Sequence, residues 1–249
     1  MTQSPHRVFL PAVEAPRLVG ALLAFAAGVV DACTFFALFG LFVAQVTGSF
    51  VLAGAQVVSA DAVNLIRTLA IPVFFLAGFA TVFLVAAAGQ SSKALTWALA
   101  VELALVAGFA LAGLIGAPFS HPNAPLALAA SLLGVCAMGV QSALVRVLMK
   151  GLPSTNVMTT NTTMAAVEIA QWVLATRRVA KLPYDVEAAE DLRIARTRFA
   201  VLWPVLAGFL AGTAVGSLAF ELIGFWAPLM SVAALAGLMV WAARFAPPG

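Results

Sequence analysis

Residues 18–39 read LVGALLAFAAGVVDACTFFALF and contain a single charged residue, Asp31. A membrane-spanning helix needs about 20 mostly apolar residues, and this stretch meets that length. It is too long to be the apolar part of a signal peptide. We therefore expect residues 18–39 to form the first of several membrane-spanning helices, with the polar residues 1–17 as an N-terminal tail on the cytoplasmic side.

The composition of the whole chain supports a membrane protein. Hydrophobic residues make up 63% of the 249 residues and charged residues only 9%, against roughly 25% in a typical soluble domain. No soluble core needs so much apolar surface, and no polar stretch is long enough for a separate soluble domain. We therefore expect one membrane domain over residues 18–245. The formal charge of +3 comes without a basic stripe, which argues against a nucleic-acid partner.

Long and short apolar segments alternate along the chain. The long segments cover residues 18–39, 68–88, 94–115, 126–147, 198–220 and 225–244, and the short ones cover residues 47–58 and 159–175. Each short segment begins with Thr and other small or polar residues, which are typical of helix starts. Each also follows a stretch that we expect to be extended, residues 42–46 and 153–157. The sequence therefore predicts an all-α membrane protein with six spans and two short half-helices.

The order of these segments is the same in the two halves of the chain. Residues 76–79 and 206–209 both read Leu-Ala-Gly-Phe, and each copy follows an Arg-Thr pair and a proline. Because these features recur in one order, we predict two repeats, over about residues 18–116 and 125–245.

The positions of Lys and Arg predict the topology. If only the six long segments cross the bilayer, every Lys and Arg except Arg67 lies on one side, which the positive-inside rule makes the cytoplasmic side. Both termini and a polar linker over residues 177–197 then lie in the cytoplasm. Each half has three spans, so the halves are inverted relative to each other, as in many secondary transporters. Eight full spans in two parallel repeats are the alternative.

Two acidic residues fall inside apolar segments. Asp31 lies past the middle of the first segment, where a charged Asp costs about 2.5 to 3.5 kcal/mol on insertion scales. It is a candidate proton-coupling residue or counter-ion for a substrate amine; alternatively, it caps a half-helix or pairs with a neighbouring helix. Glu102 is a second candidate proton carrier, with helix pairing as the alternative.

The starts of the two half-helices form a candidate binding site. Helix N-termini present free N–H groups and a partial positive charge, so two of them facing each other near the midplane would hold an anion or the carboxylate of a zwitterion. The candidate substrate-binding residues are Thr47, Gly48, Ser49, Gln141, Ser142, Thr159, Thr160 and Asn161. The alternative is that these groups only satisfy backbone groups freed by the helix breaks.

The remaining patterns concern helix packing, the two cysteines and the enzyme motifs that the sequence lacks. Gly208, Gly212 and Gly216 form a face of small residues that allows close helix packing, either within the protomer or across a homodimer interface. Cys33 and Cys136 are expected to be reduced, buried thiols, and with two distant histidines they form no metal site. The sequence has no P-loop, dinucleotide fingerprint or hydrolase motif, so we expect neither an enzyme nor a bound cofactor.

Short motifs in both halves resemble those of a known family. Residues 28–32 (GVVDA), 40–43 (GLFV) and 46–49 (VTGS) look like its first-half pattern, and residues 137–143 (AMGVQSA) and 158–161 (MTTN) look like its second-half pattern. This is the YoaK-like family, a bacterial group with a domain of unknown function, and the resemblance implies a protein of the bacterial inner membrane. Ser49 and Ser142 stand where the family often has Asn. If these positions contact substrate, the departure implies a different preference.

Together these features predict a small proton-coupled secondary transporter. Its solute would be anionic or zwitterionic and would bind between the two half-helix N-termini. An uncoupled channel or facilitator is one alternative, and a scaffold or sensor acting through residues 177–197 is another. The expected partners are the lipid bilayer and the solute, and a homodimer is also considered.

Overall fold

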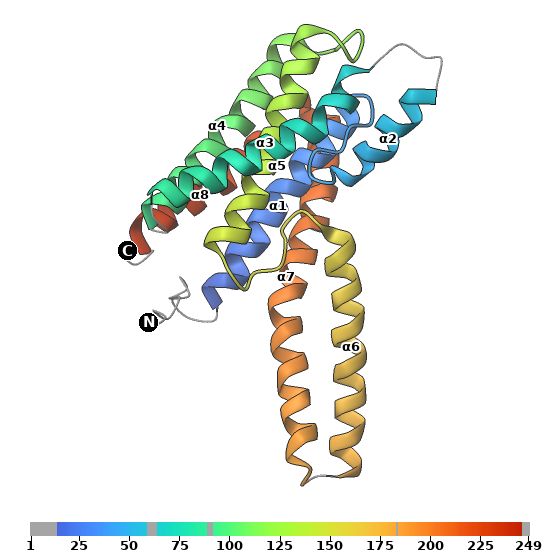
Figure 1. The fold of residues 1–249 in the computed structure, drawn as a ribbon, viewed down its shortest axis with the longest axis vertical. Coiled ribbons are helices and arrows are strands. Elements are labelled where there is room, and N and C mark those ends of the chain that lie inside the picture. The colour runs from blue at the N-terminus through green and yellow to red at the C-terminus, as the bar shows by residue number, and fades with distance from the viewer. Residues whose placement is uncertain (1–13, 59–63, 89–91, 183, 246–249) are drawn as a thin grey trace.

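The computed structural model describes residues 14–58, 64–88, 92–182 and 184–245. In these residues the chain forms eight α-helices, one 3₁₀ helix and no strand (Figure 1). The elements are α1 (Glu14–Ala37), α2 (Thr47–Val58), α3 (Leu65–Ala88), α4 (Ser92–Gly116), α5 (Pro125–Leu148), α6 (Met158–Lys181), α7 (Val186–Ile223), η1 (Gly224–Trp226) and α8 (Leu229–Phe245). Residues 1–13 of the predicted N-terminal tail lie outside the described residues, and α1 already begins within the rest of it. The predicted all-α fold is confirmed.

Five of the described helices are long and apolar enough to cross a membrane: α1, α3, α4, α5 and α7. In the segment predicted as a sixth span, residues 225–244, the α-helix begins only at residue 229. Gly224, with a φ of 55°, ends α7, and the 3₁₀ helix and Pro228 precede the shorter apolar helix α8. The chain is therefore a multi-pass helical membrane protein.

The two predicted half-helices differ in length. α2 has the predicted bounds, whereas α6 does not end at residue 175 but runs on to Lys181. Because α7 begins at Val186, most of the predicted linker, residues 177–197, is helical. α6 and α7 pack as an antiparallel hairpin that projects from the other helices (Figure 1).

Two irregular connectors lead into α2 and α6. We term residues 38–46 the first connector and residues 149–157 the second connector. The stretches expected to be extended, residues 42–46 and 153–157, form no strand, and the structure bends the chain at residues 43–44 and 155–156. Side chains of the preceding helices hold these bends in place, as described below.

The turn of the α6–α7 hairpin is organised by Asp185. Its side chain accepts a hydrogen bond from the backbone N–H of Ala188 at 3.0 Å, which caps the start of α7. It also forms an ion pair with Arg178, near the end of α6, at 2.8 Å. The hydrogen bond from Ala188 and the nearby Arg178 guanidinium lower the pKa of Asp185 below its usual value.

We expect this cap to survive mild acid. Because the pKa of Asp185 is lowered by folding, its contribution to stability is complete above the unfolded pKa and is lost only as the pH falls through the folded value. Amide hydrogen exchange at Ala188 should therefore be as well protected at about pH 5 as at neutral pH, and Asp185→Ala should speed it. Asp191→Ala, which removes a looser contact with Arg178 at 3.8 Å, is the control and should have a smaller effect. If the amide of Ala188 in the parent protein were less protected from exchange at about pH 5 than at neutral pH, this account would be contradicted.

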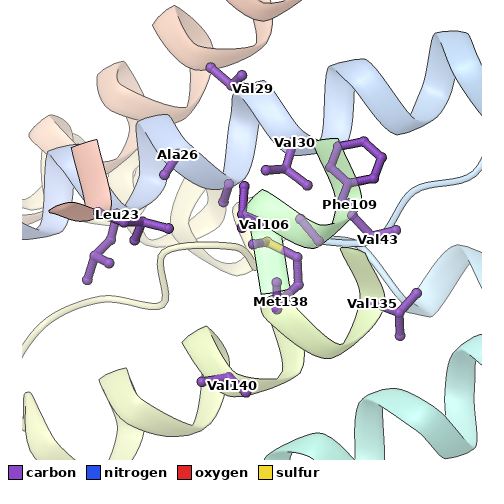
Figure 2. Packing of buried hydrophobic residues seen from close by; sticks show 14 of the residues in the cluster. Leu23, Ala26, Val29, Val30, Val43, Val106, Phe109, Val135, Met138 and Val140 are labelled. Atoms are coloured by element: carbon purple, nitrogen blue, oxygen red, sulfur yellow. The ribbon is translucent and has the colours of Figure 1, made fainter. Parts of the chain in front are cut away.

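The core forms where α1, α4 and α5 meet. Figure 2 shows Val30 of α1, Val106 and Phe109 of α4 and Met138 of α5 packed against one another, and all four side chains are fully buried. Val43 of the first connector joins this cluster, so the connector is anchored to the core and not only to its neighbours in sequence.

α1 and α7 approach each other so closely that their contact requires glycine. A Cβ atom on Gly208, Gly212 or Gly216 would collide with the backbone of α1. From the other side, a Cβ atom on Gly28 would lie 2.5 Å from the carbonyl oxygen of Phe209. The predicted small-residue face therefore packs within the protomer. A homodimer stays a prediction, and it would have to use a different surface.

Candidate functional site

A cavity of about 690 Å³ lies between α3, α5, the two connectors and the first residues of α2 and α6. Its volume is in the range of small-molecule binding sites. The polar part of its lining includes Thr47, Ser142, Arg146, Ser154, Asn156 and Thr159. The apolar part is formed largely by α3, together with Phe50 of α2.

Two helices begin at this cavity. Thr47 is the first residue of α2 and Thr159 the second of α6, and both line the cavity. No side chain among the described residues caps α6, whose N-cap residue is Val157. At α2, by contrast, the N–H groups of Gly48 and Ser49 close a turn onto the first connector. Because helix N-termini carry free N–H groups and partial positive charge, the cavity is electropositive at these ends, more so at α6.

The structure brings only some of the predicted binding residues together. Thr47, Ser142 and Thr159 line the cavity. The predicted residues that do not line it are Gly48, Ser49, Gln141, Thr160 and Asn161. Among them, Asn161 is buried and donates a hydrogen bond to the carbonyl oxygen of Ser154 at 2.5 Å, so it braces the second connector.

Asp31 fixes the first connector. Its side chain is 3% exposed, and Oδ1 accepts hydrogen bonds from the backbone N–H groups of Val43 at 2.7 Å and Ala44 at 2.8 Å. Asp31 does not line the cavity, but Ala44 does. These bonds agree with the structural alternative considered for Asp31, in which it caps backbone groups at a helix break: Asp31 holds the backbone that leads into α2. Its proton-coupling role stays a prediction.

The second connector is fixed in a similar way by amides. Gln141, on α5, donates from Nε2 to the hydroxyl of Thr155 at 2.7 Å and to the carbonyl oxygen of Leu23 at 3.0 Å. Asn156 donates to the hydroxyl of Ser142 at 2.6 Å. Gln141 of α5 therefore holds the second connector in place by hydrogen bonding, as Asp31 of α1 holds the first.

Arg146 is a cavity residue that the sequence analysis did not identify. It lies in the last turn of α5 and lines the cavity with its side chain exposed. Within the described part of the chain it forms no ion pair. In the sequence Arg146 contributed only to the topology argument, because a basic residue at a helix end is also the usual interfacial pattern.

Phenylalanines form the apolar wall of the cavity. Phe74, Phe75 and Phe79 of α3 line it together with Phe50 of α2. The rings of Phe75 and Phe79 stack with their centroids 6.4 Å apart. The wall is therefore suited to a ligand with an apolar, and especially a planar, portion.

The other candidate groups lie away from the cavity. Glu102, the second predicted proton carrier, is completely buried on α4 and does not line the cavity. Cys33 and Cys136 are free thiols. In the residues that the structure describes, no three metal-ligating side chains come together.

Comparisons with known proteins give one finding. Neither curated proteins nor solved structures yield a match to the chain. The model of a family described as "Protein of unknown function (DUF1275)" matches residues 19–241, which covers almost the whole membrane domain and confirms the resemblance noted in the sequence. The chain belongs to the DUF1275 family of proteins of unknown function.

Proposed function

We propose that this protein is a proton-coupled secondary transporter for small organic anions that have an apolar portion, including zwitterions bound through their carboxylate. The observation that carries the proposal is the cavity itself, because it combines Arg146, the uncapped start of α6 and a wall of phenylalanines. The described residues that line it include no histidine, cysteine or acidic side chain. That lining favours binding and release of a solute over catalysis by a nucleophile and a base.

The polar end of the cavity supports an anionic ligand. A guanidinium can hold a carboxylate or sulfonate with two parallel hydrogen bonds, and these charge-assisted bonds are stronger than neutral ones. Thr47, Ser142 and Thr159 line the same cavity, and their hydroxyls offer further hydrogen bonds to a ligand there. A cation would meet Arg146 and two positive helix ends, which disfavours it.

The packing of the helices supports an inverted repeat. α1 packs along α7, and its counterpart α5 packs along α3; α4 packs on α5, and its counterpart α8 packs on α1. Gly139 of α5 corresponds to Gly28 of α1, and a Cβ atom on Gly139 would lie 2.8 Å from the carbonyl oxygen of Phe74. Two equivalent halves with a cavity between their broken helices are suited to alternating access.

This repeat supports the topology in which α2 and the start of α6 do not cross the bilayer completely. α2 has 12 residues, which at 1.5 Å per residue is too short for a hydrocarbon core about 30 Å thick. We count α8 as the sixth crossing, because its 17 residues reach the lower limit for a membrane-spanning helix. With six crossings, both termini and the turn of the α6–α7 hairpin lie on the cytoplasmic side of a bacterial inner membrane.

Arg146 provides the test of the binding site. We expect Arg146→Gln to weaken binding of benzenesulfonate at least tenfold, because a hydrogen bond to a charged group contributes about 1.5–3 kcal/mol and about 1.4 kcal/mol is a factor of ten. Calorimetric titration of the purified protein in detergent measures this. Arg146→Lys keeps the charge and should lose less. Lys150→Gln, which removes a basic residue one turn further along that does not line the cavity, is the control and should bind normally.

The choice of ligands tests the class of solute. Methanesulfonate has the same charged group without the ring and should bind more weakly than benzenesulfonate, whereas benzyltrimethylammonium should not bind. Equal binding by Arg146→Gln, or binding of the cation, would show that the site is not an anion site. Uptake of benzenesulfonate into proteoliposomes without accumulation against a gradient would favour the uncoupled facilitator.

A further inference from the structure

Glu102 is a buried acid without a visible partner. Its side chain is 0% exposed, and among the described residues neither carboxyl oxygen has a hydrogen-bond partner. The neighbours of Glu102 on the same face of α4, Leu99, Val106 and Phe109, are also fully buried and apolar. Figure 2 shows Val106 and Phe109, one and two turns beyond Glu102, inside the core between α1 and α5.

Packing does not account for an acid at this position. A buried polar group without a hydrogen bond costs free energy, and an ionised one costs far more. An apolar side chain of similar length would fill the same space without that cost. Unpaired ionisable groups inside membrane segments commonly belong to ion or proton pathways.

The helices around α4 provide no fixed counter-charge. The charged residues on the elements packed against it are Arg67 of α3, Arg146 of α5 and Arg244 of α8, and α4 itself also carries Lys93. Among the residues that the structure describes, none of these bonds to the Glu102 carboxyl. Asp31 of α1 is already engaged with the first connector. The one other titratable group on α5 is the free thiol of Cys136.

The position of Glu102 links it to the proposed binding site through α5. Gly139 and Ser142 of α5 line the large cavity, whereas Val140 lines a second cavity of about 280 Å³ between α3 and α4. Val101, the residue before Glu102, lines that second cavity as well. α4 packs along α5, and Val106, one turn beyond Glu102 on the same face, lies beside Met138 of α5 (Figure 2). A shift of α5 on binding a solute would therefore change the packing around this face of α4.

We infer that Glu102, and not Asp31, carries the coupling proton in solute–proton symport. The inference rests on the proposed transport function. In each cycle the carboxylate of Glu102 takes up one proton on the side where the anion binds and releases that proton on the other side with the anion. With a monovalent anion, one proton and one negative charge move together, so the step transfers no net charge.

Transport by reconstituted protein separates this inference from the proposed function. Benzenesulfonate is the probe, because it stays ionised and does not leak through the bilayer as a neutral acid. With the interior one pH unit more alkaline, the parent protein should accumulate it up to about tenfold, the ratio of the proton concentrations. Glu102→Gln should abolish this accumulation but retain counterflow, the exchange of labelled for unlabelled benzenesulfonate without a pH gradient. Glu221→Gln, which removes an exposed carboxyl in α7, should behave like the parent.

Three outcomes would count against specific claims. Accumulation by Glu102→Gln equal to that of the parent would overturn the role of Glu102 and leave transport intact. Loss of accumulation in Glu221→Gln as well would show that the effect is not specific to Glu102. Neither accumulation nor counterflow in the parent would instead contradict the proposed function.

A second measurement is independent of the solute. Dicyclohexylcarbodiimide adds a protonated carboxyl across one of its C=N bonds and, after rearrangement, leaves a stable N-acylurea with no leaving group. Mass spectrometry should find this adduct at Glu102, with a labelling rate that falls as the pH rises. The adduct should be absent from that position in Glu102→Gln. Labelling of Glu102 at a rate that stays the same between about pH 5 and about pH 9 would show that this carboxyl does not gain and lose a proton in that range and would overturn the inference.

Discussion

Asp31→Ala is expected to lower the melting temperature of the protein by roughly 4–24 °C. Oδ1 of Asp31 accepts hydrogen bonds from two buried backbone N–H groups, those of Val43 and Ala44. Alanine leaves both donors unpaired, at a cost of about 1–3 kcal/mol each. In a chain of about 250 residues, 1 kcal/mol shifts the melting temperature by roughly 2–4 °C. Thermal unfolding of the purified variant in detergent measures the change.

The accompanying variants separate hydrogen bonding from charge. Asp31→Asn retains an oxygen in the position of Oδ1 but loses the negative charge, so its melting temperature should fall between those of the parent and Asp31→Ala. Ser131→Ala is the control for removing a buried polar group. In the described part of the chain its hydroxyl donates one hydrogen bond, to the carbonyl oxygen of Ala127 one turn back, so its loss should cost little.

These variants also decide between the two roles considered for Asp31. If Asp31 positions the connector, the Asp31→Asn protein that stays folded should still accumulate solute when a pH gradient is applied. If the melting temperature of Asp31→Asn equals that of the parent while accumulation disappears, Asp31 is a coupling residue and the positioning role is wrong.

Hydropathy and helix-start chemistry predict the elements of this fold well where the two signals agree. α2 has the predicted bounds, because Thr47 and the small residues after it mark its start and the apolar run marks its length. α6 was predicted too short, because its apolar stretch ends near residue 175 while its backbone continues through residues that are polar but helix-compatible. The contact between Arg178 and Asp185 then stabilises the turn, and such a pair across two helices has no signature in hydropathy.

The candidate site was predictable in position but not in all of its residues. The sequence located the two helix starts and three residues of the cavity lining, because a broken helix in an apolar chain leaves polar residues at its start. It could not show that Asp31 bonds to backbone 12 and 13 residues further along, since that contact depends on how the first connector folds back. Arg146 was missed for a different reason, because an Arg at a helix end serves equally for topology and for binding.

The repeated tetrapeptide Leu-Ala-Gly-Phe gives a sharp test of the packing, because the same substitution should have opposite consequences in its two copies. In the second copy, a Cβ atom on Gly208 would collide with the carbonyl oxygen of Ala21, a backbone atom that cannot move without shifting α1. In the first copy, the nearest atom to a Cβ on Gly78 is the carbonyl oxygen of Gly139 at 3.7 Å, an ordinary contact distance. The two glycines therefore have the same neighbours in sequence, and they differ in how closely the next helix approaches: α1 at Gly208 and α5 at Gly78.

We expect Gly208→Ala to destabilise the protein by about 1–3 kcal/mol, the usual cost of overpacking, and to lower the melting temperature by roughly 2–12 °C. Gly78→Ala should change it little or raise it slightly, because alanine favours helix over glycine by about 1 kcal/mol. Gly139→Ala should resemble Gly208→Ala, since its Cβ atom would lie 2.8 Å from the carbonyl oxygen of Phe74 and would collide with backbone at the contact between α5 and α3. Equal melting temperatures for Gly208→Ala and Gly78→Ala would mean that α1 and α7 can separate freely, and that the close crossing does not hold the two halves together.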